Sequence, residues 1–320
     1  MPHKFAFINY KGGVGKTSLA VNVASHLALA GKRTLLVDLD TQSNSSVWLM
    51  GLATWREVQD EEIPSICTYL TDASVSLEEA RFRNVFRTRE DAYAGIPLDI
   101  IPCNFQLIEI EDRSYRPKSD NPVFFDFFKS QESFIDEYDY VIYDCPPNLL
   151  EAARCGIFSA DSIIVPANPD ALSQIGLVLL VEKLDEFRAL SDLYLNDTCK
   201  NHAEIRSIIF NAIKTGSDFA MPRIRMQMQL NQLRYSDSVH LDSEIMDHTV
   251  RDAIVVKRAV TAGLPVAMLD RMTTQGNVVE DFANVARALA QIAEMPLNPE
   301  EEYSRLPELR ECANQVTSSS

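Results

Sequence analysis

The chain has 320 residues, of which 46% are hydrophobic and 24% are charged, proportions that are ordinary for a globular protein. The formal net charge is −16, which argues against whole-surface attraction to nucleic acid or anionic lipid and requires a local patch for any such contact. Six cysteines occur without a C-x-x-C pair, so they indicate buried thiols in a reducing compartment rather than a zinc site or a disulfide framework.

The first residues enter an apolar run, "KFAFINY", within three positions, and no signal peptide is visible. No uninterrupted apolar run approaches the roughly 20 residues that a membrane-spanning helix requires. We therefore expect a cytoplasmic protein.

Short apolar runs alternate with amphipathic segments along most of the chain. The runs that are apolar on both faces are predicted strands: 5–9, 34–38, 98–102, 140–144, 162–166, 207–211 and 265–269. The amphipathic segments between them include 16–30, 175–191 and 278–294 and are predicted helices. Strands that are apolar on both faces are typical of a parallel sheet covered by helices on both sides. The alternation therefore predicts a doubly wound α/β fold with a mostly parallel sheet.

No composition change or Gly/Ser linker marks a second core before residue 295. Residues 1–295 are therefore predicted to form one domain. Residues 296–320 are acidic and polar and end in "VTSSS", so we expect a flexible, solvated C-terminal tail.

The first predicted strand leads directly into the string "KGGVGKTS". A strand, a glycine loop and a helix in this order form the arrangement of a phosphate-binding loop. Gly12, Gly13 and Gly15 would let the backbone approach phosphate oxygens, and the following helix would add its positive N-terminal end. Lys16 would then reach the β- and γ-phosphates, and the Thr17 hydroxyl would bind Mg²⁺.

The string differs from the general pattern because Tyr10 stands where glycine is usual and Lys11 precedes the glycines. In this form it resembles the deviant Walker A motif of the ParA/MinD family of ATPases, a SIMIBI-class P-loop fold. The resemblance implies that Lys11 reaches across a dimer interface to the partner's ATP, so that dimerisation requires ATP. It also implies the loop residues that bind ATP: Gly12, Gly13, Val14, Gly15, Lys16, Thr17 and Ser18.

The second predicted strand ends in "LLVDLDTQSNSS", where two acids stand at the ligand-facing edge of an open α/β sheet. The segment resembles the family's switch I motif, with Thr41 in place of a proline. The resemblance implies that Asp40 orients or deprotonates the attacking water. It further implies that Asp38 supports Mg²⁺ through a water molecule.

A third acid closes the apolar run in "YDYVIYDCPPN". This segment resembles the family's Walker B and switch II motif, which implies that Asp144 holds Mg²⁺ through water. Cys145 lies next to it, but no base is placed near it in the sequence, so nucleophilic catalysis by cysteine is not expected. Asn211 ends a later strand in "SIIFNAIKTG" and matches the asparagine that contacts adenine in the family. A strand-end cap is the alternative role for Asn211.

A basic region follows. Between residues 200 and 234, six basic residues stand against two acids, and 219–236 contains no acid. In partition ATPases this region carries sequence-independent DNA binding, whereas an ordinary solvated helical face would have the same composition. Phosphate contacts would make DNA affinity fall steeply with salt. The candidate DNA-contacting residues are Arg223, Arg225, Arg234, Arg251, Lys257 and Arg258.

The resemblance covers most of 1–295 and implies a Mg²⁺-dependent ATPase with an ATP-driven monomer–dimer switch. Its role would be to position DNA or another large cargo with a ParB-like adaptor, and it would be associated with the nucleoid if it binds DNA. One alternative is a MinD-like positioning ATPase, although the acidic C-terminus would be repelled by anionic lipid. Others are an iron–sulfur carrier, which needs paired cysteines, an ATP-binding scaffold without useful turnover, and a metabolic ligase of the same fold.

Overall fold

The structure is a computed structural model. It describes residues 1–72, 74–85, 96–114, 133–194, 203–214, 216, 218–269 and 278–297. The predicted tail, 296–320, therefore lies almost wholly outside the described residues. Among the described helices, none combines the length and the apolar character that crossing a membrane requires.

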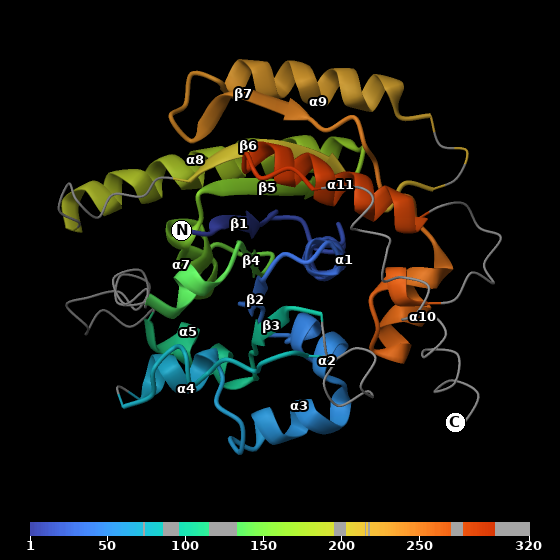
Figure 1. The fold of residues 1–320 in the computed structure, drawn as a ribbon. Coiled ribbons are helices and arrows are strands. Elements are labelled where there is room, and N and C mark those ends of the chain that lie inside the picture. The colour runs from blue at the N-terminus through green and yellow to red at the C-terminus, as the bar shows by residue number, and fades with distance from the viewer. Residues whose placement is uncertain are drawn as a thin grey trace.

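A seven-stranded sheet runs through the centre of the molecule in the order β3-β2-β4-β1-β5-β6-β7 (Figure 1). Every neighbouring pair is parallel, which confirms the predicted doubly wound α/β fold. The strands are β1 (His3–Phe7), β2 (Thr34–Asp38), β3 (Leu98–Ile101), β4 (Tyr140–Asp144), β5 (Ser162–Ala167), β6 (Glu204–Phe210) and β7 (Val239–Ile245).

Helices cover both faces of the sheet. They are α1 (Lys16–Leu29), α2 (Asn44–Met50), α3 (Leu52–Gln59), α4 (Ile66–Thr71), α5 (Gln106–Ser114), α7 (Glu151–Ser159), α8 (Ala171–Tyr194), α9 (Ala220–Leu233), α10 (Ile254–Ala262) and α11 (Val278–Ile292). Two short 3₁₀ helices, η3 (Ser133–Glu137) and η5 (Val266–Met268), complete the described elements.

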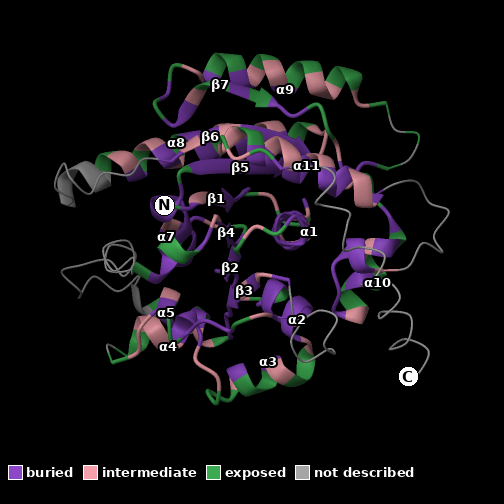
Figure 2. Cartoon of the chain, viewed as in Figure 1, coloured by how far each residue is buried: buried purple, intermediate pink, exposed green. Residues whose placement is uncertain are grey.

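Alternate side chains of the strands enter two separate hydrophobic cores. Phe5 and Phe7 point into the core that α1 and α11 close, whereas Ala6 and Ile8 belong to the core beneath α7 and α8. The central strands are buried on both faces of the sheet (Figure 2). This double burial explains why the central strands are continuously apolar in sequence.

Two predictions about strands differ from the structure. The apolar run 265–269 is not a strand: it forms the 3₁₀ helix η5, where the Val266 backbone N–H donates to Asn22 of α1 at 2.9 Å. Its apolar side chains are buried against helices instead of in the sheet. The edge strand β7 was not predicted, because its exposed positions Leu241, Asp242 and Glu244 interrupt the apolar pattern.

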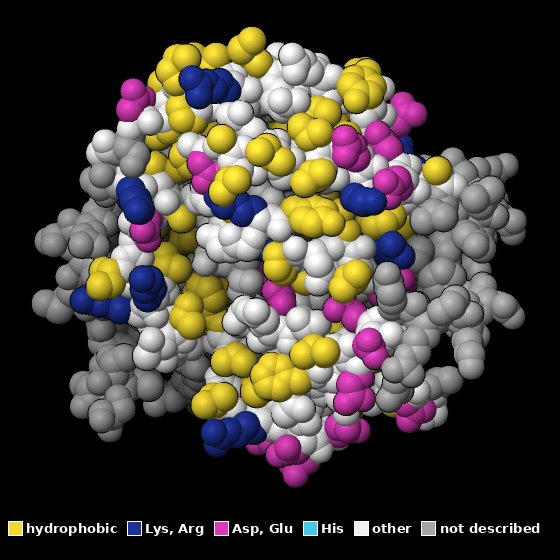
Figure 3. Space-filling view, turned by 180° about the vertical axis from the view of Figure 1, so that it is seen from behind, with side chains coloured by type: hydrophobic (Ala, Val, Ile, Leu, Met, Phe, Trp, Pro, Cys, Tyr) yellow, Lys and Arg dark blue, Asp and Glu magenta, His cyan; other side chains and the backbone are white. Residues whose placement is uncertain are grey.

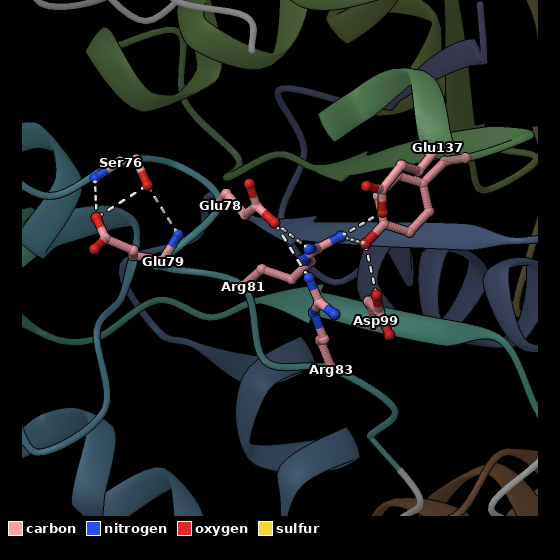
Figure 4. Close-up of polar contacts among 8 residues, drawn as sticks. Ser76, Glu78, Glu79, Arg81, Arg83, Asp99 and Glu137 are labelled. Atoms are coloured by element: carbon pink, nitrogen blue, oxygen red, sulfur yellow. Dashed lines mark hydrogen bonds and ion pairs between the residues drawn. The ribbon is translucent and has the colours of Figure 1, made fainter. Parts of the chain in front are cut away.

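The other edge of the sheet, β3, is covered by the chain before it. Phe82 forms an antiparallel bridge with Ile100 of β3. Nearby, the Arg81 side chain is only 2% exposed and donates to Glu78, to Glu137 and to the Tyr138 hydroxyl, which in turn donates to Asp99 at 2.6 Å (Figure 4). A covered edge offers no row of free backbone groups to another chain.

The arrangement of strands around β1 determines where a ligand can bind. β1 lies between β4 and β5, and the chain leaves β1 through α1 toward β2 on one side while β5 and β6 continue on the other. The sheet order therefore reverses at β1. In open α/β sheets, ligands bind at this point, beyond the carboxyl ends of the strands.

Candidate active site

The glycine loop leaves β1 at the reversal point and ends at the start of α1. Gly13 and Gly15 have φ values of +75° and +77°, which side chains other than glycine rarely adopt. A Cβ on Gly15 would lie 2.2 Å from Asn211 Nδ2. Glycine is therefore required at position 15 for both backbone geometry and space.

Asn211 follows the end of β6 and is 3% exposed. Its Nδ2 donates to the carbonyl oxygens of Val14 at 2.8 Å and Gly15 at 3.1 Å. The sequence motif predicts this residue as an adenine contact. In the structure, these hydrogen bonds tie the glycine loop to the end of β6, two strands away from β1 in the sheet.

Lys16 is the first residue of α1 and is 7% exposed. Burial lowers the pKa of Lys16, while the carboxylates of Asp144 and Asp40 act in the opposite direction. A buried ammonium between two carboxylates, at the mouth of a glycine loop, is placed to bind a phosphate.

Asp38 and Asp144 are direct neighbours because they are register partners on β2 and β4. Asp38 Oδ2 accepts hydrogen bonds from the Ser46 backbone N–H at 2.9 Å and hydroxyl at 2.7 Å. Asp144 Oδ2 accepts one from the Ser45 hydroxyl at 2.5 Å. Both side chains are fully buried.

The electrostatics of this pair fit a divalent cation. Burial, together with the charge of Asp144, raises the pKa of Asp38 to about 8. Burial likewise raises the pKa of Asp144 to about 6, although hydrogen bonds from Ser45 and Thr17 lower it. Asp144 Oδ1 is buried without a hydrogen-bond partner in the described part of the chain. An oxygen donor set of this kind, with the Thr17 hydroxyl beside it, matches what Mg²⁺ prefers.

Asp40 lies just beyond the end of β2 and is 7% exposed. Its Oδ1 accepts the Gln42 backbone N–H at 3.0 Å, and its own backbone N–H donates to Asp38 at 3.1 Å. These bonds fix the Asp40 carboxylate within its own loop, and its charge raises the pKa of Lys16 against the effect of burial. The structure places Asp38, Asp40 and Asp144 near one another at the carboxyl ends of β2 and β4.

Lys11 forms an ion pair with Asp170, which precedes α8. Asp170 also accepts the Ser173 backbone N–H at 2.8 Å and so caps the start of that helix. The Lys11 backbone N–H donates to Asn9, whose amide donates to the Pro166 carbonyl oxygen at 2.6 Å. Within this single chain, Lys11 thus contacts its own subunit.

Cys145 is fully buried, and burial together with the charge of Asp144 raises the pKa of its thiol well above the ordinary value. A protonated, inaccessible thiol is a poor nucleophile, in agreement with the expectation from the sequence. Several supporting residues were not identified from the sequence, because they act over long chain separations: Asn9, Ser45, Ser46 and Asp170.

Three of the six candidate DNA-contacting residues have partners within the chain. Arg223 donates to the carbonyl oxygens of Ile245 and Met246 and to Asp247, and Arg234 donates to the Ser243 carbonyl oxygen. Arg251 forms a two-pronged pair with Asp281, at 2.6 and 2.8 Å.

The remaining three candidates are exposed: Arg225 on α9, and Lys257 and Arg258 on α10. The two helices lie in well separated parts of Figure 1. On the face seen in Figure 3, basic side chains are scattered among acidic and hydrophobic ones instead of forming one patch.

Comparison with known proteins gives the family. A family model described as an AAA domain matches residues 3–197. The chromosome-partitioning ATPase Soj of Treponema pallidum is 26% identical over 287 residues, covering 88% of this chain and 96% of that protein. A ParA family protein of Mycoplasma genitalium is 29% identical over 57% of this chain, which corresponds to 65% of that protein.

A solved structure with the same fold is the McdA(D38A)–ATP complex of Cyanothece, with a TM-score of 0.67 and 18% identity over 90% of this chain and 96% of that chain. Fold, site and relatives together define a P-loop ATPase. The chain belongs to the ParA/MinD family of ATPases. The McdA structure is a complex with ATP, and a MinD structure from Pyrococcus horikoshii is a complex with Mg-ADP.

Proposed function

We propose that this protein is a ParA-like positioning ATPase, which hydrolyses ATP slowly and uses an ATP-dependent dimer to position DNA or another large cargo. The single observation that carries the proposal is the convergence of Lys16, Asp40 and Asp144 on the glycine loop at the reversal point of the sheet. Relatives named as chromosome-partitioning ATPases support the cargo-positioning role.

Within one subunit, each group has a distinct task. The backbone N–H groups of residues 12–18 and the Lys16 ammonium bind and compensate phosphate charge. Thr17, Asp38 and Asp144 would hold Mg²⁺, which supplies further charge compensation at the phosphates. Asp40 orients the attacking water and accepts its proton.

Dimerisation is proposed to depend on Lys11. Because Lys11 pairs with Asp170 in the single chain, it must leave that partner before it can reach a nucleotide in the opposite subunit. Two ATP molecules facing each other bring several negative charges together, and a lysine from each opposite chain would offset them. ATP binding therefore favours the state in which Lys11 exchanges partners.

DNA contact is proposed for the exposed basic residues. Lys257 and Arg258 are the strongest candidates. Both lie one turn from Ile254 on the exposed side of α10, and no acid among the described residues forms an ion pair with either. Arg225 is a further candidate on α9. Arg223, Arg234 and Arg251 are instead proposed to stabilise the fold, because their guanidinium groups already have partners.

Asp40→Ala is the experiment that tests the proposed activity. The variant should bind Mg²⁺-ATP but lose hydrolysis by about 10²–10⁴-fold, the usual value of a positioned general base, and should therefore accumulate as an ATP-bound dimer. ATPase assays and light scattering measure the two effects. Hydrolysis at the wild-type rate would remove Asp40 from this role. If the ATP-bound dimer does not bind DNA at low salt, the result favours the alternative of a MinD-like positioning ATPase that does not act on DNA.

A further inference from the structure

Asn9 stands between strand β1 and the glycine loop, and it is only 1% exposed. Its amide group has two partners. Nδ2 donates to the Pro166 carbonyl oxygen of β5 at 2.6 Å, and Oδ1 accepts the Lys11 backbone N–H at 2.9 Å. The orientation of the amide is unambiguous, because a carbonyl oxygen only accepts and a backbone N–H only donates. One buried side chain therefore fastens the first residue of the "KGGVGKTS" loop to the strand beside β1.

Helix α8 leaves this amide little room to move. A Cβ placed on Gly176 of α8 would lie 3.4 Å from Asn9 Oδ1, so the helix approaches closely at a residue without a side chain. Losing either hydrogen bond would leave a buried polar group without its partner, which is costly. Asn9 is therefore held in one position by its own partners and by α8.

Lys11 is held at two points, and the two differ in strength. Its backbone N–H is fixed by the buried Asn9, whereas its ammonium pairs with Asp170. The side chain of Asp170 is 43% exposed and that of Lys11 is 24% exposed, and solvent screening makes such ion pairs weak. The ammonium can therefore exchange its partner while the backbone of Lys11 stays attached to β5.

From this geometry we propose that Asn9 is a positioning residue for Lys11, which holds the Lys11 backbone to β5 so that only the side chain moves toward the opposite subunit. The inference rests on the proposed function, because it concerns how Lys11 reaches the partner's nucleotide. A fixed backbone limits the positions that the ammonium can sample and so lowers the entropy cost of reaching the productive one. Asn9 would not contact the nucleotide itself.

The test uses mixtures of two variants that are each expected to be inactive. Lys11→Ala keeps the residues that bind ATP in its own subunit but provides no lysine to its partner. Lys16→Ala should not bind ATP but still provides Lys11. A mixed dimer then has one occupied site, and ATPase activity in this reference mixture reports the action of Lys11 from the opposite chain.

Asn9→Ala is then added to one subunit or the other. Combined with Lys16→Ala, it loosens the backbone of the only Lys11 that acts, and ATPase activity should fall about tenfold below the reference mixture, because small misplacements of a reacting group are costly. Combined with Lys11→Ala, it affects the subunit that holds ATP, and activity should stay within about twofold of the reference, as expected for a residue that acts only through Lys11. Both mixtures contain the same three substitutions, so each is the control for the other.

Equal activity in the two mixtures would overturn the role of Asn9, as would a larger loss when Asn9→Ala lies in the subunit that holds ATP. An inactive reference mixture would instead contradict the proposed action of Lys11, and this inference with it. Asn9→Ser is the second variant if Asn9→Ala does not fold. Its hydroxyl can accept the Lys11 N–H but is too short to reach the Pro166 carbonyl oxygen, so the same difference between the two mixtures is expected.

Discussion

Asp38 and Asp144 show how strand register determines the chemistry of single side chains. Each ends an apolar strand, and the parallel pairing of β2 with β4 places them opposite one another. Neither acid gains its position from a local turn, and 106 residues of chain separate them. The raised pKa of Asp38 reduces the repulsion within this buried pair, and hydroxyl donors together with Lys16 favour the charged form of Asp144.

Glu111 allows a pH prediction at the same scale. Burial raises its pKa to about 7 in the folded chain, above the ordinary glutamate value of about 4.3. The stability contributed by its neutral form is therefore complete below about pH 4.3 and is lost as the pH rises toward 7. Asp40 and Glu151 are the charged groups that act on it.

Glu111→Gln removes this titration. The melting temperature of the variant relative to the wild type should therefore increase between about pH 5 and pH 8, by about 2 °C after allowance for partial exposure. Thermal unfolding without nucleotide measures the difference, and Glu109→Gln, an exposed charge change on the same helix, should show no such trend. A constant difference between the two proteins across this range would contradict the effect of burial on Glu111.

Helix α10 carries the prediction at the level of elements. The double charge reversal Lys257→Glu with Arg258→Glu should weaken DNA binding. It should also reduce the slope of log affinity against log salt by about 0.9 for each phosphate that the helix no longer neutralises. ATP binding should not change, because among the described residues no printed contact joins a side chain of α10 to the glycine loop.

Lys32 and Arg33 are two adjacent basic residues at the turn between α1 and β2, and they supply the control for the charge reversal on α10. Lys32→Glu with Arg33→Glu makes the same change in net charge at the opposite end of β2 from the nucleotide site. If the two double variants bind DNA equally well, the interaction depends on overall charge, and α10 loses its assigned role.

The elements also show what could be predicted from the sequence. The site residues Lys16, Asp38, Asp40 and Asp144 were predictable, because each follows a strongly apolar central strand whose end is locally marked. The edge strand β7 was not predictable. It buries only part of its surface, and the exposed residues Leu241, Asp242 and Glu244 interrupt its apolar pattern. The run 265–269 was assigned wrongly, since an apolar segment buried beneath helices has the same composition as a buried strand.

Side-chain partners that are distant in sequence carried no local signal. The six candidate DNA-contacting residues looked alike in sequence, yet in the structure three of them have partners within the chain, whereas Arg225, Lys257 and Arg258 are exposed and lack an ion-pair partner among the described residues. The contact Lys11–Asp170 joins segments 159 residues apart, and the contact Ser45–Asp144 joins segments 99 residues apart. Only the folded arrangement of strands and helices brings such groups together.

At the scale of the whole molecule, the proposed dimer can be tested by complementation. Lys11→Ala should bind ATP but fail to dimerise or turn over, while Lys16→Ala should fail to bind ATP. In a mixed dimer, the Lys11→Ala subunit holds the nucleotide and the Lys16→Ala subunit still provides Lys11. Mixing two inactive variants should therefore restore part of the ATPase activity.

The control for this experiment is a mixture of Lys11→Ala with a variant that carries both substitutions. That mixture provides no Lys11 at the occupied site and should remain inactive. Equal activity in the two mixtures would contradict the action of Lys11 across the interface. An ATP-bound dimer in which Lys11 still pairs with Asp170 would contradict it structurally.

The clamp between Asn211 and the glycine loop has a consequence for the choice of purine. Nδ2 of Asn211 already donates to the carbonyl oxygens of Val14 and Gly15, so in the adenine contact that the sequence motif predicts, Asn211 would offer Oδ1, which can accept but not donate. Adenine offers an amino group at the edge where guanine presents a carbonyl oxygen. An acceptor facing an acceptor is repulsive and leaves a polar group unpaired. Discrimination against GTP would then arise from the same contact that fixes the loop, and a chain that loosened the clamp would also lose its preference for the base.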